Sequence, residues 1–200
     1  MGNERVCQRR QVVLQSEGLS VKHSVRAVAF AIFLLLPSLI KAEADIPPDC
    51  RIKNRPPGRC GWCAVETLAR HMRIEPLYGL TDAHSCKACS ADLETALTER
   101  GVRYRIQQTG NTNIDILHLA VRKGYGAAVG FRELRPGKGP HIVTLIDIGP
   151  NEVRVIDPND QDGRVRVMPL DRFLYWWDGL ALVLEPDERV PSQNSSASME

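Results

Sequence analysis

The strongest constraint on the fold is a change of sequence pattern at Gly124. Before it, apolar residues recur at helical spacing, and Gly101 and Gly124 stand where two helical segments would end. After it come short β-branched runs separated by Gly, Pro and Asn, which are typical of antiparallel strands. Helices followed by strands predict an α+β domain, with an N-terminal helical part packed on a C-terminal antiparallel β-sheet.

The same patterns place the individual elements. Helices are expected at 60–73, 91–100 and 114–123. Strands are expected at 102–107, 127–131, 141–148, 152–157, 164–168 and 179–185, with a brief helix or turn at 170–177. Residues 45–59 hold Pro-Pro twice and little periodicity, which predicts an extended arm in front of the first helix.

A 14-residue apolar run at 27–40, "AVAFAIFLLLPSLI", lies between basic residues and the small-residue stretch "KAEAD". This order is that of a secretory signal peptide, and the run is shorter than the roughly 17 to 25 residues of a membrane span. Cleavage is expected after Ala42 or Ala44. We predict a signal peptide and leader over 1–44, a mature domain over 45–185 and a disordered tail over 186–200.

This organisation predicts a secreted or periplasmic protein, with an uncleaved N-terminal membrane anchor as the alternative. The long basic lead before Lys22 leaves the true start codon open. With 26 Lys and Arg against 24 Asp and Glu, the chain offers no field that would attract nucleic acid.

Five cysteines remain after the predicted cleavage: Cys50, Cys60, Cys63, Cys86 and Cys89. Thiols outside the cytoplasm tend to pair, so an odd number leaves one that needs a reason to stay reduced. The stretch "PPGRCGWC" at 56–63 puts two of them where a Pro/Gly-rich approach becomes a helix.

Several interpretations of this pair are open. Four thiolates from the two Cys-x-x-Cys pairs could bind zinc, although the gap between the pairs exceeds the usual range. A redox pair would need a buried strand in front of it, and Pro56 and Pro57 argue against one. The cysteines could also be structural, either buried or bridged.

The remaining interpretation is a nucleophile at Cys60, because suitable partners follow it. A thiol in the first turn of a helix is acidified by unsatisfied N–H groups and by a nearby imidazolium. His141 opens one expected strand, and Asp157 ends the next, 16 residues later. A hairpin through "GPNE" would bring the two together, which predicts a Cys60–His141–Asp157 triad for acyl transfer through a thioester.

With these residues in this order, the chain resembles the papain-like cysteine peptidases, most closely the bacteriocin-processing type that removes double-glycine leaders. In that family a Cys-Gly pair starts a helix, a histidine begins a later strand, and an Asp-Pro pair follows it. Here Cys60-Gly61, His141 and Asp157-Pro158 match, at spacings of 81 and 16 residues, within 50–184. The resemblance implies a papain-like fold and hydrolysis of a peptide or protein substrate with no metal or organic cofactor.

The family also carries a Gln six positions before the nucleophile, whose amide completes the oxyanion hole. Asn54 stands there, one methylene shorter, and is the candidate donor beside the Cys60 N–H. A rival alignment makes Cys63 the nucleophile, but it puts Pro57 at the Gln position. If Cys60 is the reactive thiol, the other four cysteines can form two disulfides in three pairings: Cys50, Cys63, Cys86 and Cys89.

Two further functions stay open at this point. "GRCGWCA" fits the Gly-x-Cys-x-x-x-Ala pattern of transglutaminase-like domains, whose acceptor is an amine rather than water, although Ile142 and Val143 stand where those domains commonly have an aromatic residue. A papain-like shell could also serve as an exported binding module without catalysis. The sequence reveals neither the specific substrate nor the oligomeric state.

Overall fold

The computed structural model describes residues 44–85, 87–132 and 140–186. Residues 1–43 of the predicted signal peptide and leader, nearly all of the predicted tail and Cys86 lie outside these ranges, so the expectations for them stay predictions. Among the described residues, no helix has the length and apolar character needed to cross a membrane.

The helices expected at 60–73, 91–100 and 114–123 are all found with ends within two residues of those expected, and a 3-10 turn interrupts the expected extended arm. The 3-10 turns are η1 (Pro48–Cys50) and η2 (Glu75–Leu77), and the α-helices are α2 (Cys60–His71), α3 (Leu80–Ala83), α4 (Ser90–Glu99), α5 (Asp115–Arg122) and α6 (Leu170–Trp176). The strands are β1 (Arg103–Gln107), β2 (Ala127–Phe131), β3 (His141–Ile148), β4 (Glu152–Ile156), β5 (Val165–Pro169) and β6 (Trp177–Glu185).

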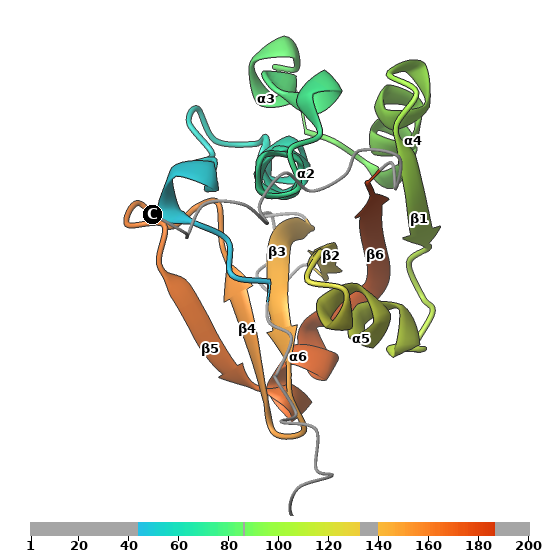
Figure 1. Cartoon of the computed structure of the whole chain (residues 1–200). Coiled ribbons are helices and arrows are strands. Elements are labelled where there is room, and N and C mark those ends of the chain that lie inside the picture. The colour runs from blue at the N-terminus through green and yellow to red at the C-terminus, as the bar shows by residue number, and fades with distance from the viewer. Residues whose placement is uncertain (1–43, 86, 133–139, 187–200) are drawn as a thin grey trace, which may run out of the picture. The chain divides into compact units, whose positions relative to one another are not determined.

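The strands form one antiparallel sheet in the order β1-β6-β2-β3-β4-β5. Figure 1 shows α2, α3 and α4 gathered on one side of this sheet and α5 and α6 on the other. Two apolar clusters fill the spaces between these layers, one beneath each group of helices. The predicted α+β class, with the helix of Cys60 packed on an antiparallel sheet, is confirmed.

Strand β3 is covered on both faces, which explains its continuous apolar sequence. Ile142 and Ile146 belong to the cluster under α2, whereas Val143 and Leu145 belong to the cluster under α5 and α6. Side chains alternate between the two faces of a strand, so a strand buried on both sides needs apolar residues at nearly every position.

Helix α2 is buried more completely than its predicted amphipathic pattern implies. Residues 61–69 are all buried, including Glu66, which is 2% exposed. The carboxylate of Glu66 accepts hydrogen bonds from the N–H groups of Gly79 and Thr81 and forms an ion pair with Arg70. These partners make the burial of a charge tolerable, because an unpaired buried charge is very costly.

The last strand occupies the interior of the sheet. β6 pairs with β1 through Ile106 and Leu182 and with β2 through Ala128 and Leu182. β1 follows α4 directly, so this arrangement joins the N-terminal and C-terminal parts of the domain in one sheet.

Ala44 is already part of the fold, although the predicted boundary assigns it to the leader. It is 1% exposed, and its N–H donates to the carbonyl of Ile146 at 3.0 Å. Cleavage after Ala44 would remove this contact and cleavage after Ala42 would keep it, so the contact favours Ala42. The domain boundaries themselves stay predictions.

Gly126 offers a test of how tightly α2 and β3 are packed. Gly124 and Gly126 both have positive φ, 73° and 71°, but an added Cβ would meet nothing within 4 Å at Gly124, whereas at Gly126 it would lie 2.7 Å from the Leu145 carbonyl oxygen. We expect Gly124→Ala to cost about 1–2 kcal/mol of unfolding free energy through backbone strain alone. Gly126→Ala should cost a further ~1–3 kcal/mol through overpacking.

Urea unfolding of the two variants and the wild type measures this difference. Equal losses of stability in the two variants would show that the structure around the Leu145 carbonyl shifts to accommodate the added methyl group at no cost in free energy.

Candidate active site

The candidate nucleophile Cys60 is the first residue of α2. Pro56 and Pro57 prevent the helix from extending backwards, and Gly58, with φ at 105°, turns the chain into it. The first helical turn closes where the Cys63 N–H donates to the Arg59 carbonyl at 3.0 Å. The sulfur therefore lies at the helix end that carries unsatisfied N–H groups and partial positive charge.

The half-buried Cys60 thiol is hydrogen-bonded to the His141 ring. Burial acts to raise the pKa of this thiol, but the hydrogen bond and charge of His141, together with the N–H groups of Ile142 and Gly61, lower it below its ordinary value. Each of these donors stabilises the thiolate rather than the thiol.

His141 opens β3 and holds the opposite side of its ring against Asp157. The distance from His141 Nε2 to Asp157 Oδ1 is 2.8 Å, which leaves Nδ1 for the sulfur. Burial acts to lower the pKa of His141, but the hydrogen bonds to Asp157 and Cys60 and the negative charges of both raise it to about 9. The imidazolium is therefore the favoured form at neutral pH.

Asp157 follows the last residue of β4 and completes this chain of contacts. Burial acts to raise the pKa of its carboxyl, whereas the hydrogen bond and charge of His141 and the Asn159 N–H lower it. The Asn159 N–H donates to Asp157 Oδ1 at 2.8 Å. The hairpin of β3 and β4 thus brings His141 and Asp157 together as its sequence predicts.

Taken together, the three groups form an ion-paired set. Below about pH 9 His141 carries a proton, and above the lowered pKa of Cys60 the sulfur carries a negative charge. Between these limits a thiolate faces an imidazolium, which a carboxylate supports from behind. This is the charge state that a thiol nucleophile needs.

Asn54 lies near this set but is engaged by hydrogen bonds. It is 7% exposed, its Oδ1 accepts from the Arg59 N–H at 2.8 Å, and its Nδ2 donates to Asn159 Oδ1 at 2.7 Å. One of its two amide N–H bonds is therefore used within the protein. The second N–H of the Asn54 amide could donate a hydrogen bond to an oxyanion.

Asn159 is a residue of the site that the sequence patterns did not single out. It contacts Asp157 through its backbone and Asn54 through its side chain, and its Nδ2 lies 3.4 Å from His141 Nε2. The available signal was its place directly after the Asp-Pro pair, which by itself indicates only a turn.

Cys63, the alternative nucleophile, points into the core. It is 0% exposed, and burial raises the pKa of its thiol to about 11 despite a hydrogen bond with Thr81. Trp62 is likewise buried, stacked on His84 with ring centroids 3.8 Å apart. The structure thus places Cys60, and not Cys63, against His141.

The structure shows no disulfide among the cysteines it describes: Cys50, Cys60, Cys63 and Cys89 are free thiols. Each of the three expected pairings needs one bridge between two of Cys50, Cys63 and Cys89, so the expected pair of disulfides is not seen. Bridges to Cys86 fall outside the described residues. Within those residues, no three His, Cys, Asp or Glu side chains gather as metal ligands.

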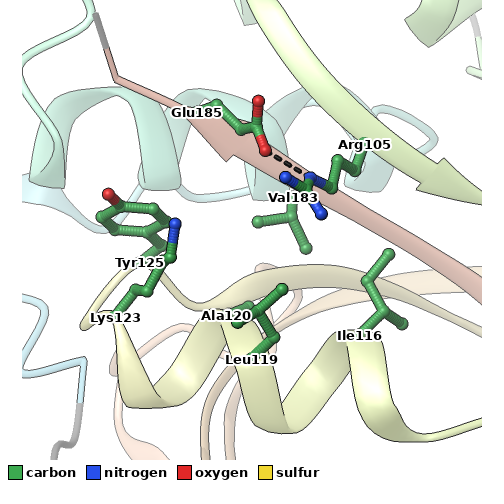
Figure 2. A pocket seen from close by; sticks show the side chains of 8 residues that line it. All are labelled: Arg105, Ile116, Leu119, Ala120, Lys123, Tyr125, Val183 and Glu185. Carbon is green, nitrogen blue, oxygen red and sulfur yellow. Dashed lines mark hydrogen bonds and ion pairs between the residues drawn. The ribbon is translucent and has the colours of Figure 1, made fainter. Parts of the chain in front are cut away.

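Two hollows in the described surface lie apart from these residues. One, between α5 and the paired strands β1 and β6, is crossed by the ion pair of Arg105 with Glu185 (Figure 2) and measures about 10 Å³, at the lower limit of the ~10–15 Å³ that one water needs. The other, about 310 Å³, is lined by Arg132, Trp177 and Asp178 among others. Neither contains Cys60, His141, Asp157 or Asn54.

Comparison with known proteins finds the same fold in solved peptidase domains. A double glycine motif protease from an AMS/PCAT transporter, solved with the leader peptide, is 13% identical, with a TM-score of 0.54 over 74% of this chain and 96% of that one. The peptidase domain of Streptococcus ComA, a bifunctional ABC transporter of a quorum-sensing pathway, is 19% identical, with a TM-score of 0.51 over 68% and 97%.

No family model matches the chain, and no curated protein does either. The fold is therefore shown by structure alone. The expected resemblance to double-glycine peptidase domains of the papain-like type is confirmed at this level.

The ion-paired site predicts selective alkylation of Cys60. At mildly acidic pH, iodoacetamide should modify Cys60 faster than Cys50 or Cys63, because the pKa of Cys60 is lowered whereas those of Cys50 and Cys63 are raised. Each unit of pKa difference changes the thiolate population about tenfold. Timed labelling followed by peptide mass spectrometry measures all three thiols in one sample.

His141→Ala should remove the advantage of Cys60, since the imidazolium that stabilises the thiolate is lost. Wild-type Cys60 reacting no faster than Cys50, or labelling that is indifferent to His141→Ala, would contradict the assigned charge state.

Proposed function

We propose that this protein is a cysteine peptidase in which Cys60, His141 and Asp157 hydrolyse a peptide bond through a thioester. The observation that carries the proposal is the continuous contact from the Cys60 sulfur through the His141 ring to the Asp157 carboxylate. The shared fold with peptidase domains supports it.

In the first step the Cys60 thiolate attacks the carbonyl carbon of the scissile bond, and the carbonyl oxygen becomes an oxyanion. His141 then gives its Nδ1 proton to the leaving amine as the C–N bond breaks, which leaves a thioester on Cys60. Water next attacks the thioester while His141 takes its proton, and the carboxylic acid product leaves as the thiolate re-forms. Asp157 keeps the imidazole oriented and stabilises its positive charge.

The oxyanion needs donors at the start of α2. The Cys60 N–H stands in the first turn of the helix, where N–H groups lack intrahelical partners. The second N–H of the Asn54 amide is the candidate partner, because its first is bound to Asn159. A donor of this kind contributes about 10²–10³-fold to turnover in other acyl-transfer enzymes.

For the substrate, we propose a peptide cleaved after two glycines. The support is the fold shared with a double glycine motif protease, which was solved with its leader peptide. The apolar run at 27–40 supports the further proposal that this peptidase acts outside the cytoplasm.

A peptide panel tests this function. Synthetic peptides with Gly-Gly, Gly-Ala or Ala-Ala before the cleaved bond are incubated with the protein and followed by mass spectrometry. Cys60→Ala should abolish cleavage, and His141→Ala and Asp157→Asn should lower kcat by at least about 10³-fold. Cys89→Ser is the matched control, because it alters an exposed thiol at the start of α4 and should leave turnover unchanged.

Added hydroxylamine or a primary amine separates hydrolysis from acyl transfer to an amine. A peptidase releases the free acid as its main product, whereas transfer to the amine in preference to water would identify the transglutaminase-like alternative. Cleavage that persists in Cys60→Ala would contradict the proposal, and loss of all cleavage in the wild type across the panel would favour a binding module.

The pH dependence follows from the same two groups. Turnover should rise as Cys60 loses its proton and should fall above about pH 9, where His141 loses the proton that the leaving amine requires. The measurement is kcat/KM of the best peptide across pH. A profile that keeps rising well beyond the pKa of His141 would show that the imidazolium is not the proton donor.

A further inference from the structure

The turn after β4 contacts both sides of the active site through one residue, Asn159. Its backbone N–H donates to Asp157 Oδ1 at 2.8 Å, and its side-chain Oδ1 accepts from Asn54 Nδ2 at 2.7 Å. Asn54 in turn precedes the nucleophile by six residues and lies 105 residues away from Asn159 in sequence. Asn159 therefore joins the carboxylate end of the triad to the segment that leads into α2.

A backbone group determines the orientation of the side-chain amides of Asn54 and Asn159. The Arg59 N–H can only donate, so the atom of Asn54 that faces it at 2.8 Å is the carbonyl oxygen. This puts Asn54 Nδ2 toward Asn159, and the atom of Asn159 that receives it must be Oδ1. The Asn159 NH₂ group then faces His141, where its Nδ2 lies 3.4 Å from Nε2.

A second bond ties the same two segments together. The Asn54 backbone N–H donates to the Pro158 carbonyl at 2.8 Å. Because this bond involves only backbone atoms, it holds the segments in contact even when the Asn159 side chain is shortened. The side-chain hydrogen bond is therefore not needed to hold the two segments together. Its role is to orient the Asn54 amide.

Asn54 is 7% exposed, so its amide has little water to turn to if Asn159 is lost. A buried amide donor without a partner is costly, and the side chain would rotate to recover one. That rotation would also move the second Asn54 N–H, the one left for an oxyanion, because both N–H bonds lie in one planar group.

We propose that Asn159 is a positioning residue: its side-chain carbonyl holds the Asn54 amide in the orientation that donates to the oxyanion. This inference rests on the proposed peptidase function. It assigns Asn159 no direct contact with the substrate. It also separates two properties of the site, since oxyanion binding depends on the Asn159 side chain whereas the thiolate depends on His141 and Asp157.

A peptide aldehyde, acetyl-Gly-glycinal, probes the oxyanion without turnover. The Cys60 thiolate forms a bond to the aldehyde carbon, the carbonyl π electrons move to oxygen, and that oxygen takes the proton of His141 or stays charged in the oxyanion position. Its affinity is measured by the protection that it gives Cys60 against iodoacetamide. The alkylation rate without aldehyde, taken across pH, reports the thiolate in the same samples.

Asn159→Ala should weaken aldehyde binding at least about tenfold, which is less than the 10²–10³-fold cost in turnover of removing one oxyanion donor altogether. Its alkylation rate and pH dependence should stay within about twofold of the wild type, because the Asn159 backbone N–H and the His141–Asp157 contact remain. Asn159→Asp should restore aldehyde binding, since a carboxylate oxygen accepts the same bond from Asn54.

Asn151→Ala is the matched control. Asn151 is an exposed asparagine in the turn between β3 and β4, and this substitution should change neither readout. Asn54→Ala and the double variant Asn54→Ala with Asn159→Ala should bind the aldehyde equally weakly, because Asn159 acts through Asn54. If Asn159→Ala fails to fold, Asn159→Gln takes its place in the series, because the longer side chain displaces the carbonyl by one methylene.

Unchanged aldehyde affinity in Asn159→Ala overturns the inference. A parallel fall of aldehyde affinity and alkylation rate also overturns it, because a purely structural role gives that result. Failure of the proposed function looks different: the aldehyde does not protect wild-type Cys60 at all. In that case the hydrogen bond from Asn54 to Asn159 is tested on its own by the side-chain amide signals of Asn54 in a ¹⁵N NMR spectrum. The bond requires that these signals shift in Asn159→Ala and not in Asn151→Ala.

Discussion

The structure depends on the burial of α2 against β3. Residues 61–69 of the helix are enclosed, and Leu68, Val65 and Ala64 share a cluster with Ile142 and Ile146 of the strand. Each buried Leu, Val or Ile side chain contributes about 1.5–3 kcal/mol, and close-packed interiors resist small displacements. The sulfur at the start of the helix and the imidazole at the start of the strand therefore keep a fixed separation, set by many contacts that take no part in the chemistry.

Charged groups inside this packing connect α2 to the chain that follows it. Glu66 receives the N–H groups of Gly79 and Thr81, and Arg59 donates to the Thr81 carbonyl at 2.8 Å. These three bonds fix the short turn around α3 to α2 and to Arg59, the residue directly before Cys60. Loss of either partner would strand a charge in the interior, so these bonds select one arrangement of the helical layer more than they stabilise the fold as a whole.

The sequence was most informative where local pattern decides the outcome. A Pro/Gly-rich approach defines the start of α2, and a tight turn between two β-branched runs places Asp157 beside His141, so three residues of the site follow from short-range rules. The Asn54–Asn159 bond does not, because it joins positions 105 residues apart and depends on how the two parts of the chain dock. Likewise, glutamates are rarely fully buried, and only the tertiary contacts with Gly79 and Thr81 explain the burial of Glu66.

The interior place of β6 has a consequence for the order in which the protein is completed. β6 (Trp177–Glu185) is the last described strand in the chain, yet it lies between β1 and β2, and Phe131 pairs with both Trp177 and His141. A chain synthesised or translocated from its N-terminus cannot finish this sheet until its final strand has emerged. The nascent polypeptide thus carries Cys60 before the sheet behind His141 is complete, so the contact between these two residues gains its full support only after β6 has been added.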